Sequence, residues 1–317
     1  MRLLPKAVMI AVAGAVWTMS AFAQDYPSRQ VNLVIPFPPG GNTDLMARAL
    51  QPELAKALGQ AIVVINKGGA GGTIGNIEVA SARADGYTIG LTPNNPLTAQ
   101  PHVQKLPYGM DSFKYVCLTY YVPYVLIASP KAPFKTFQEF AAFTKAKPDN
   151  LIYASPGPGT QPHLGILSAL GAIKAEGIHV PFTGAGPMSQ AMLAGTVMAM
   201  SESTAVAKAS NLVVLAAQTK ERIASLPDVP TMQELGSPSE AFSAGGLVVP
   251  AATPDAVVAR LEKACGDAVA SEGYRSATEK LNAIARFLPG PEFRKMFDAD
   301  SVANAEAVKK AGLAQAK

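Results

Sequence analysis

The sequence predicts an α/β protein of two lobes, each a doubly wound sheet, joined by a hinge in which the chain crosses twice. The first third alternates short apolar strands with amphipathic helices, and the alternation starts again near residue 122. After residue 246, another strand and several helices return the chain to the first lobe. A β-α-β order favours mostly parallel sheets with helices on both faces.

The first lobe is built from a regular alternation of strands and helices. The expected elements are strand 31–36, helix 43–58, strand 62–65, helix 74–83 and strand 87–91. Apolar residues recur every four positions in the first helix, at Met46, Leu50, Leu54 and Leu58, which predicts one buried face. Pro52 is expected to kink this helix, because proline cannot donate the backbone hydrogen bond.

The second lobe repeats the pattern with shorter elements. They are strand 122–129, a helix after Thr136, strand 151–154, helix 162–170, strand 178–180, helix 187–194, and strands 197–200 and 212–216. Gly195 is expected to end the helix that precedes it, because glycine adopts the left-handed C′ conformation at little cost. A crossing strand at 246–250, helix 255–270 and tail helices near 272–284 and 290–312 complete the chain. We therefore predict lobe boundaries at 24–124 plus 247–317 and at 125–246.

The loop after the first strand has the pattern of an anion site. Residues 36–41 read Pro-Phe-Pro-Pro-Gly-Gly, and the next helix opens with Asn42, Thr43 and Asp44, all good N-cap residues. Free N–H groups and the helix dipole at such a start both favour negative charge. The loop contains no Lys, Arg or His, so an anion would be held by backbone and hydroxyl groups.

The second lobe carries a counterpart at residues 155–163, where a strand again enters a Gly/Pro loop that leads into a helix. Ser155, Thr160 and Gln161 can donate hydrogen bonds to carboxylate oxygens. His163 is either a donor to the ligand or a structural residue. The loop at 180–184 repeats the theme, and Phe182 and Phe37 face either an apolar ligand body or the core.

These loops and their order along the chain resemble the Bug family, the solute-binding proteins of tripartite tricarboxylate transporters. The similar blocks are residues 36–44, 58–60, 66–75, 84–88, 106–108, 153–164, 179–184 and 226–231. The resemblance implies a type II periplasmic-binding-protein fold and capture of a small carboxylate, aliphatic or aromatic, between the lobes. It also implies delivery to a two-component membrane permease. The alternative is a subunit that presents its ligand to a membrane sensor kinase.

The resemblance also bears on two acidic positions. Glu202-Ser203 stands where the family usually has Asp-Ser, and Ser201 stands where a Phe is frequent, so the pocket shape differs there. Asp44 matches the loop acid of the family and either caps backbone N–H groups or contacts a ligand amine. The ligand-binding residues that we predict are Phe37, Pro39, Gly40, Gly41, Thr43, Asp44, Ser155, Gly157, Gly159, Thr160, Gln161, His163, Phe182, Thr183, Glu202 and Ser203.

The N-terminus has the features of a secretory signal. Arg2 and Lys6 precede a short apolar run, and residues 21–23 read Ala-Phe-Ala, which predicts cleavage after Ala23 and a periplasmic protein. Of the 27 basic residues these two would be lost, which leaves 25 against 23 acidic residues. A net charge of about +2 is not the footprint of a nucleic-acid-binding protein, so no nucleic-acid partner is expected.

Catalytic, metal and cofactor patterns are missing from the sequence. There is no G-x-S-x-G motif, and the three histidines share no metal-ligand spacing with Cys or paired carboxylates. The glycine-dense segment 67–76 lacks the phosphate-loop lysine and the dinucleotide-loop spacing. We therefore expect a binding protein without catalytic residues, metal or cofactor.

Two cysteines, Cys117 and Cys265, remain after export. An oxidising compartment permits a disulfide between them. Their spacing cannot show that they meet, because a disulfide needs Cα atoms within about 7 Å. Two buried thiols are therefore the expectation, in preference to a bridge.

Overall fold

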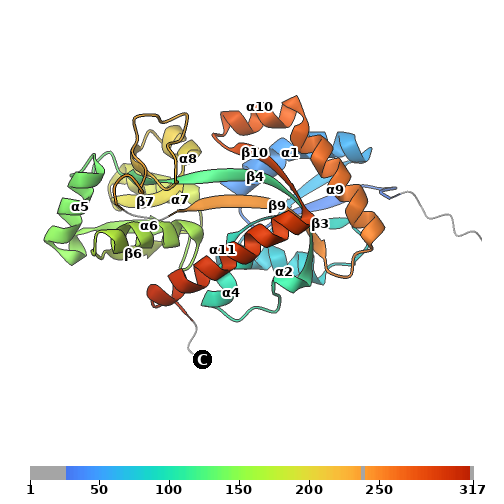
Figure 1. The fold of residues 1–317 in the computed structure, drawn as a ribbon, viewed down its shortest axis with the longest axis horizontal. Helices are drawn as coiled ribbons and strands as arrows, with labels where there is room; N and C mark the ends of the chain where they lie inside the picture. Colours follow the sequence, from blue (N-terminus) through green and yellow to red (C-terminus); the bar gives the residue numbers. More distant parts are fainter. Residues whose placement is uncertain (1–25, 237–239, 315–317) are drawn as a thin grey trace, which may run out of the picture.

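The computed structural model describes residues 26–236 and 240–314, so the predicted signal at 1–23 lies outside the described residues. The predicted α/β architecture of two lobes is confirmed (Figure 1). Strands follow one another in the order β2-β1-β3-β9-β4-β7-β5-β6. We call the elements around β1 to β3 the first lobe and those around β5 to β7 the second. The boundaries given above stay a prediction.

The first lobe follows the predicted alternation. Its elements are β1 (Val31–Ile35), α1 (Asn42–Leu58), β2 (Ile62–Asn66), α2 (Thr73–Ser81) and β3 (Thr88–Pro93), followed by the short helices α3 (Asn95–Thr98) and α4 (Gln100–Val103). β1 pairs with β2 and with β3 in parallel. α1 continues through Pro52 as one helix. Its residues Met46, Leu50, Leu54 and Leu58 are buried, as their spacing predicted.

Two long antiparallel strands connect the lobes. β4 (Phe113–Ala128) and β9 (Phe242–Pro250) pair side by side and run between the lobes in Figure 1. The sequence predicted only the ends of these strands, at 122–129 and 246–250. β4 also pairs with β7 and β8, so the two predicted sheets share this strand instead of being separate.

The second lobe contains the remaining parallel strands. Its elements are α5 (Phe137–Ala146), β5 (Ile152–Ser155), α6 (Gln161–Ala172), β6 (Ile178–Pro181), α7 (Ala185–Ala194), β7 (Ala199–Ser203), α8 (Thr204–Ala209) and β8 (Val213–Ala217). Thr136 and Glu139 form a capping box at the start of α5. Gly195 ends α7 with φ 79°, as predicted. Single 3₁₀ turns lie at Ala70–Gly72, Met110–Ser112 and Pro148–Asn150.

The C-terminal segment returns to the first lobe. It forms α9 (Asp255–Ala270), α10 (Glu272–Lys280), β10 (Ile284–Pro289) and α11 (Gly290–Lys310). The predicted end of the helix at 272–284 is wrong, because β10 begins at Ile284 and pairs with β4. α11 contacts α3 in the first lobe and α6 in the second, and it lies across the face seen in Figure 1.

A disulfide joins Cys117 on β4 to Cys265 on α9, with their Cα atoms 6.6 Å apart. The expectation of two buried thiols is therefore wrong. Both residues are fully buried in the core of the first lobe. They lie 148 residues apart in the chain, so only the return of α9 onto the sheet brings them together.

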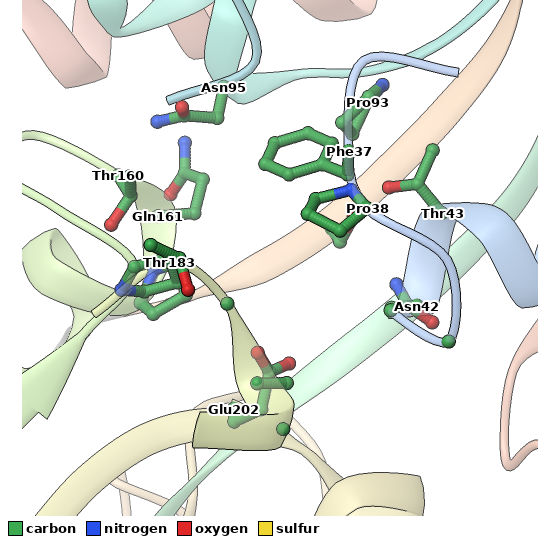
Figure 2. A pocket seen from close by; sticks show the side chains of 18 of the residues that line it. Phe37, Pro38, Asn42, Thr43, Pro93, Asn95, Thr160, Gln161, Thr183 and Glu202 are labelled. Atoms are coloured by element: carbon green, nitrogen blue, oxygen red, sulfur yellow. The ribbon is translucent and has the colours of Figure 1, made fainter. Parts of the chain in front are cut away.

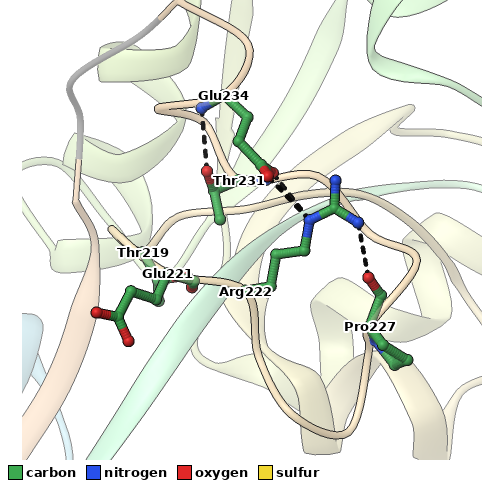
Figure 3. A network of polar contacts seen from close by, with 6 residues as sticks. All are labelled: Thr219, Glu221, Arg222, Pro227, Thr231 and Glu234. Atoms are coloured by element: carbon green, nitrogen blue, oxygen red, sulfur yellow. Dashed lines mark hydrogen bonds and ion pairs between the residues drawn. The ribbon is translucent and has the colours of Figure 1, made fainter.

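The segment between β8 and β9 is ordered by a small polar network (Figure 3). The Arg222 guanidinium donates to the Glu234 carboxylate at 3.0 Å and to the carbonyl of Pro227 at 2.8 Å. Glu234 also accepts the Thr231 N–H, while the Thr231 hydroxyl accepts the Glu234 N–H. These bonds hold the loop that carries the 226–231 block, and they lie away from the cavity described next.

Candidate functional site

A cavity of about 370 Å³ lies between the lobes, at the carboxyl ends of β1, β3, β5, β6 and β7 (Figure 2). Ligands of open α/β sheets bind at this edge, because the loops of neighbouring strands meet there. Among the predicted site residues, those that line the cavity are Phe37, Pro39, Gly40, Gly41, Thr43, Thr160, Gln161, Thr183 and Glu202. A neighbouring cavity of about 700 Å³ shares Phe37, Pro39 and Thr183 and adds Gly157 and Phe182.

The other predicted residues lie behind the cavity wall. They are Asp44, Ser155, Gly159, His163 and Ser203, and none of them belongs to the lining of either cavity. Each holds a loop or helix end in place through hydrogen bonds. That they contact a ligand stays a prediction, and the hydrogen bonds described here favour a positioning role.

The start of α1 differs in detail from the prediction. Gly41 is the N-cap, with φ −78° and no side-chain capping bond, so Asn42, Thr43 and Asp44 lie in the first turn. The Asp44 carboxylate instead accepts the Gly40 N–H at 2.9 Å, as well as bonds from Arg48 and Asn66. Burial opposes ionisation of this carboxyl, but these donors outweigh it and lower the pKa of Asp44. The acid thus fixes the shape of the loop.

Three helices present uncapped N-termini to the cavity. α1 begins after Gly41, α6 after Thr160 and α7 after Gly184, and no side chain caps any of the three. All three N-cap residues line the cavity. The first N–H groups of a helix have no partner within the helix, and the dipole places partial positive charge there. The convergence of three such ends creates a site for an anion.

The loop between β5 and α6 is held by an aromatic stack in which Tyr153 and His163 are buried. The rings of His163 and His179 lie 4.0 Å apart, and Tyr153 stacks on both. Nδ1 of His163 accepts the Gly159 N–H at 3.1 Å, and Nε2 of His179 lies 2.7 Å from the Ser155 hydroxyl. Burial, with a smaller effect of His179, lowers the pKa of His163 to about 3. His163 is therefore neutral and supports the loop.

Asn42, Asn94 and Asn95 also line the cavity, although none of them is among the predicted ligand-binding residues. Nδ2 of Asn95 donates to the carbonyl of Gly159 at 2.8 Å, which leaves its Oδ1 buried without a partner among the described residues. Nδ2 of Asn42 is buried and likewise unpartnered in this part of the chain. Buried polar atoms are rarely left unpaired, so both point to a ligand or water. Asn95 follows the end of β3 at the same sheet edge as the 36–41 loop, and this position could have identified it.

Glu202 is the one acidic residue among the described residues that line the cavity. It is the second-last residue of β7, is 5% exposed, and accepts the Ser203 N–H at 2.7 Å. Burial raises its pKa to about 7, although the bonds from Ser203 act in the opposite direction. No Lys, Arg or His stands in the described lining. Backbone and neutral side chains therefore supply the positive potential of the site.

Two α/β lobes with a cavity between them, onto which helix N-termini converge, are typical of solute-binding proteins. Within residues 26–236 and 240–314, no helix combines the length and the apolar composition needed to cross a membrane. The model of the tripartite tricarboxylate transporter family receptor, TctC, matches residues 46–308. The chain belongs to this family, which confirms the resemblance to the Bug proteins.

Individual relatives are similar to this protein along most of its length. A protein from Cupriavidus necator, named UPF0065 protein in gbd 5′ region, is 31% identical over 316 residues, which are 98% of this chain and 96% of that one. The structure of the periplasmic binding protein BugD has a TM-score of 0.84 and 31% identity, covering 92% of this chain and all of BugD. MatC from Rhodopseudomonas palustris with bound malate has a TM-score of 0.82 and 32% identity, covering 89% and 100%.

Proposed function

We propose that this protein captures a small carboxylate in the periplasm and delivers it to a membrane permease of the tripartite tricarboxylate type. The observation that carries the proposal is the convergence of three uncapped helix N-termini, those of α1, α6 and α7, on one cavity. Such an arrangement matches the charge of a carboxylate without needing a cation. The malate bound to the related MatC supports the same class of ligand.

The dimensions and lining of the cavity narrow the range of ligands that it can hold. A volume of about 370 Å³ suits a small metabolite. Phe37, Pro38 and Pro39 form an apolar wall on one side, as Figure 2 shows for Phe37 and Pro38. We infer an aliphatic di- or tricarboxylate or an aromatic carboxylate, with its anionic group at the helix ends and its carbon skeleton against this wall.

The test is a thermal-shift screen of the purified mature protein against a panel of small carboxylates, each paired with its neutral amide. A ligand that binds the folded state raises the melting temperature by mass action. We expect some carboxylates to stabilise the protein and their amides to do so far less. Equal stabilisation by acids and amides, or none by any acid, contradicts carboxylate binding.

Export and transport need separate measurements. Mass spectrometry of the periplasmic protein should find Gln24 as its first residue. Uptake of the best ligand by whole cells should require both this protein and a two-component permease. A full-length chain that stays with the membrane, or uptake that persists without the protein, contradicts these parts of the proposal.

A further inference from the structure

The cavity contains a feature that anion binding alone does not explain. Glu202 places a carboxylate inside a site whose helix ends favour anions, and Figure 2 shows its side chain directed toward the space beside Asn42 and Thr183. Its Oε1 accepts the Ser203 N–H at 2.7 Å. The Ser203 side chain also interacts with this carboxylate. A carboxylate offers about four lone-pair positions, so two bonds from Ser203 still leave acceptor capacity.

No positive side chain stands ready to neutralise Glu202. β4 pairs with β7 beside it and brings Tyr124, whose pKa is raised well above its usual value by burial, with the Glu202 charge contributing. α7 carries no charged residue, and Lys208 lies at the exposed far end of α8. Asp44 and its partner Arg48 lie behind the wall formed by the start of α1. Glu202 therefore lacks a counter-ion among the described residues that face it.

A second acceptor in the same cavity has no partner at all among the described residues. Oδ1 of Asn95 is buried without a donor in the described part of the chain, and the bond from its Nδ2 to Gly159 fixes the orientation of this amide. The cavity thus combines hydrogen-bond donors at the helix ends with two acceptors, Glu202 and Asn95, that can accept hydrogen bonds from a ligand. A ligand that carried only carboxylates would offer no hydrogen atom to either acceptor and would leave them to water, whereas a ligand with a donor would pair with them directly.

We propose that Glu202 determines specificity by selecting small carboxylates that also carry a hydrogen-bond donor, a protonated amine in preference to a hydroxyl. This inference rests on the proposed function and narrows it. The ligand carboxylate lies at the helix N-termini, and its ammonium group lies at Glu202, where it supplies the missing positive charge. A second ligand carboxylate at this position is repelled by Glu202 unless a proton is taken up.

The direction of the pH dependence separates the two kinds of ligand. Burial raises the pKa of Glu202 to about 7, so the residue is mostly ionised at pH 8 and mostly protonated at pH 6. An ammonium needs the ionised form, so an amino carboxylate should bind about tenfold more weakly at pH 6 than at pH 8. A dicarboxylate prefers the protonated form, and its affinity would change in the opposite direction.

The experiment uses calorimetry with the mature protein and matched sets of ligands. In each set the same aliphatic or aromatic monocarboxylate carries at one position a hydrogen, an amine, a hydroxyl or a second carboxylate. The variants are Glu202→Gln, which removes the charge at nearly constant shape, and Glu279→Gln, which removes one charge from an exposed part of α10. Thermal unfolding of each variant establishes that it is folded.

We expect the amino member of the best set to bind at least tenfold more tightly than its unsubstituted and dicarboxylate counterparts. Glu202→Gln should remove this preference and the pH dependence, while Glu279→Gln keeps both. Equal or tighter binding of the unsubstituted acid or the dicarboxylate overturns the inference and leaves the proposed function standing. An unchanged preference in Glu202→Gln also overturns it. Failure of every carboxylate in every set overturns the proposed function itself.

Discussion

At the scale of single residues, the glycines of the cavity wall differ in what a side chain would meet. Gly41 has φ −78°, and an added Cβ would make an ordinary contact with the carbonyl of Pro38. Gly159 has φ 69°, and its Cβ would collide with the side chain of Val103. A side chain is therefore compatible with the backbone and packing at Gly41 but not at Gly159. Gly159 is needed for backbone conformation and for packing between the lobes.

We predict that Gly41→Val weakens ligand binding tenfold or more, because its side chain extends toward the cavity, and that it changes the free energy of unfolding little. Gly159→Val should instead destabilise the protein, by about 1–2 kcal/mol for the left-handed conformation alone. Calorimetry and urea unfolding of both variants measure the two effects. Wild-type affinity in Gly41→Val would show that the ligand does not approach this loop.

Asp44 provides a second residue-scale prediction, because its carboxylate organises the first anion loop. Its lowered pKa means that the charged form stabilises the native state above the unfolded pKa of about 3.9, and that this stability is lost as pH falls through the folded pKa. Asp44→Asn should cost about 1–3 kcal/mol at pH 7. Urea unfolding of both proteins at pH 7 and pH 3 measures this cost. The difference in unfolding free energy between wild type and variant should be smaller at pH 3. A constant difference would point to a role independent of charge.

At the scale of elements, the helix N-termini of α1, α6 and α7 replace cationic side chains in the site. Salt screens exposed ion pairs much more than buried backbone hydrogen bonds. We therefore predict that the affinity for the best carboxylate changes less than about threefold between 50 and 500 mM salt. Titrations at both salt concentrations test this. A loss of tenfold or more would reveal a cationic clamp, with Arg48 and Lys67 as the first residues to substitute.

The elements also show what the sequence could predict and what it could not. Helix 255–270 agrees with α9 residue for residue, since a proline before it and a serine after it mark its ends. β10 was missed because it is a partly exposed edge strand, Ile284–Pro289, placed between two helices with no alternating apolar pattern. The first half of β4 was missed because its burial is almost continuous, which hides the period of two.

Within the site, local patterns were informative and long-range contacts were not. The strand-loop-helix pattern found the loops of residues 36–41 and 155–160. It could not tell that Ser155 and His163 face the Tyr153 and His179 stack instead of the cavity, because that depends on contacts between separate strands. No sequence pattern marked Asn95 itself as a site residue. Only the shared sheet edge brings it to Gly159 and the cavity.

At the scale of the whole molecule, the Cys117–Cys265 disulfide links the connecting strand β4 to the returning helix α9. Closing so long a loop removes conformational entropy from the unfolded chain, so the disulfide should contribute about 3–5 kcal/mol. We predict a matching loss in the Cys117→Ala/Cys265→Ala protein, measured by urea unfolding. Ligand affinity should stay the same, because both cysteines are buried in the first lobe, away from the cavity. Reduced affinity in a folded variant would contradict this separation.

The reliance of the site on backbone amides has an evolutionary consequence. Pro162 and Pro187 in the first turns of α6 and α7 have no N–H. Every other residue there carries an amide N–H, so most point mutations at the three helix ends leave the donors in place. Side chains such as Glu202 and Asn95 can change in a single step. The proposed recognition of a carboxylate would therefore be robust to mutation, while the choice among carboxylates would be open to it. Duplicated genes with this backbone can acquire new ligands without first losing the ability to bind an anion.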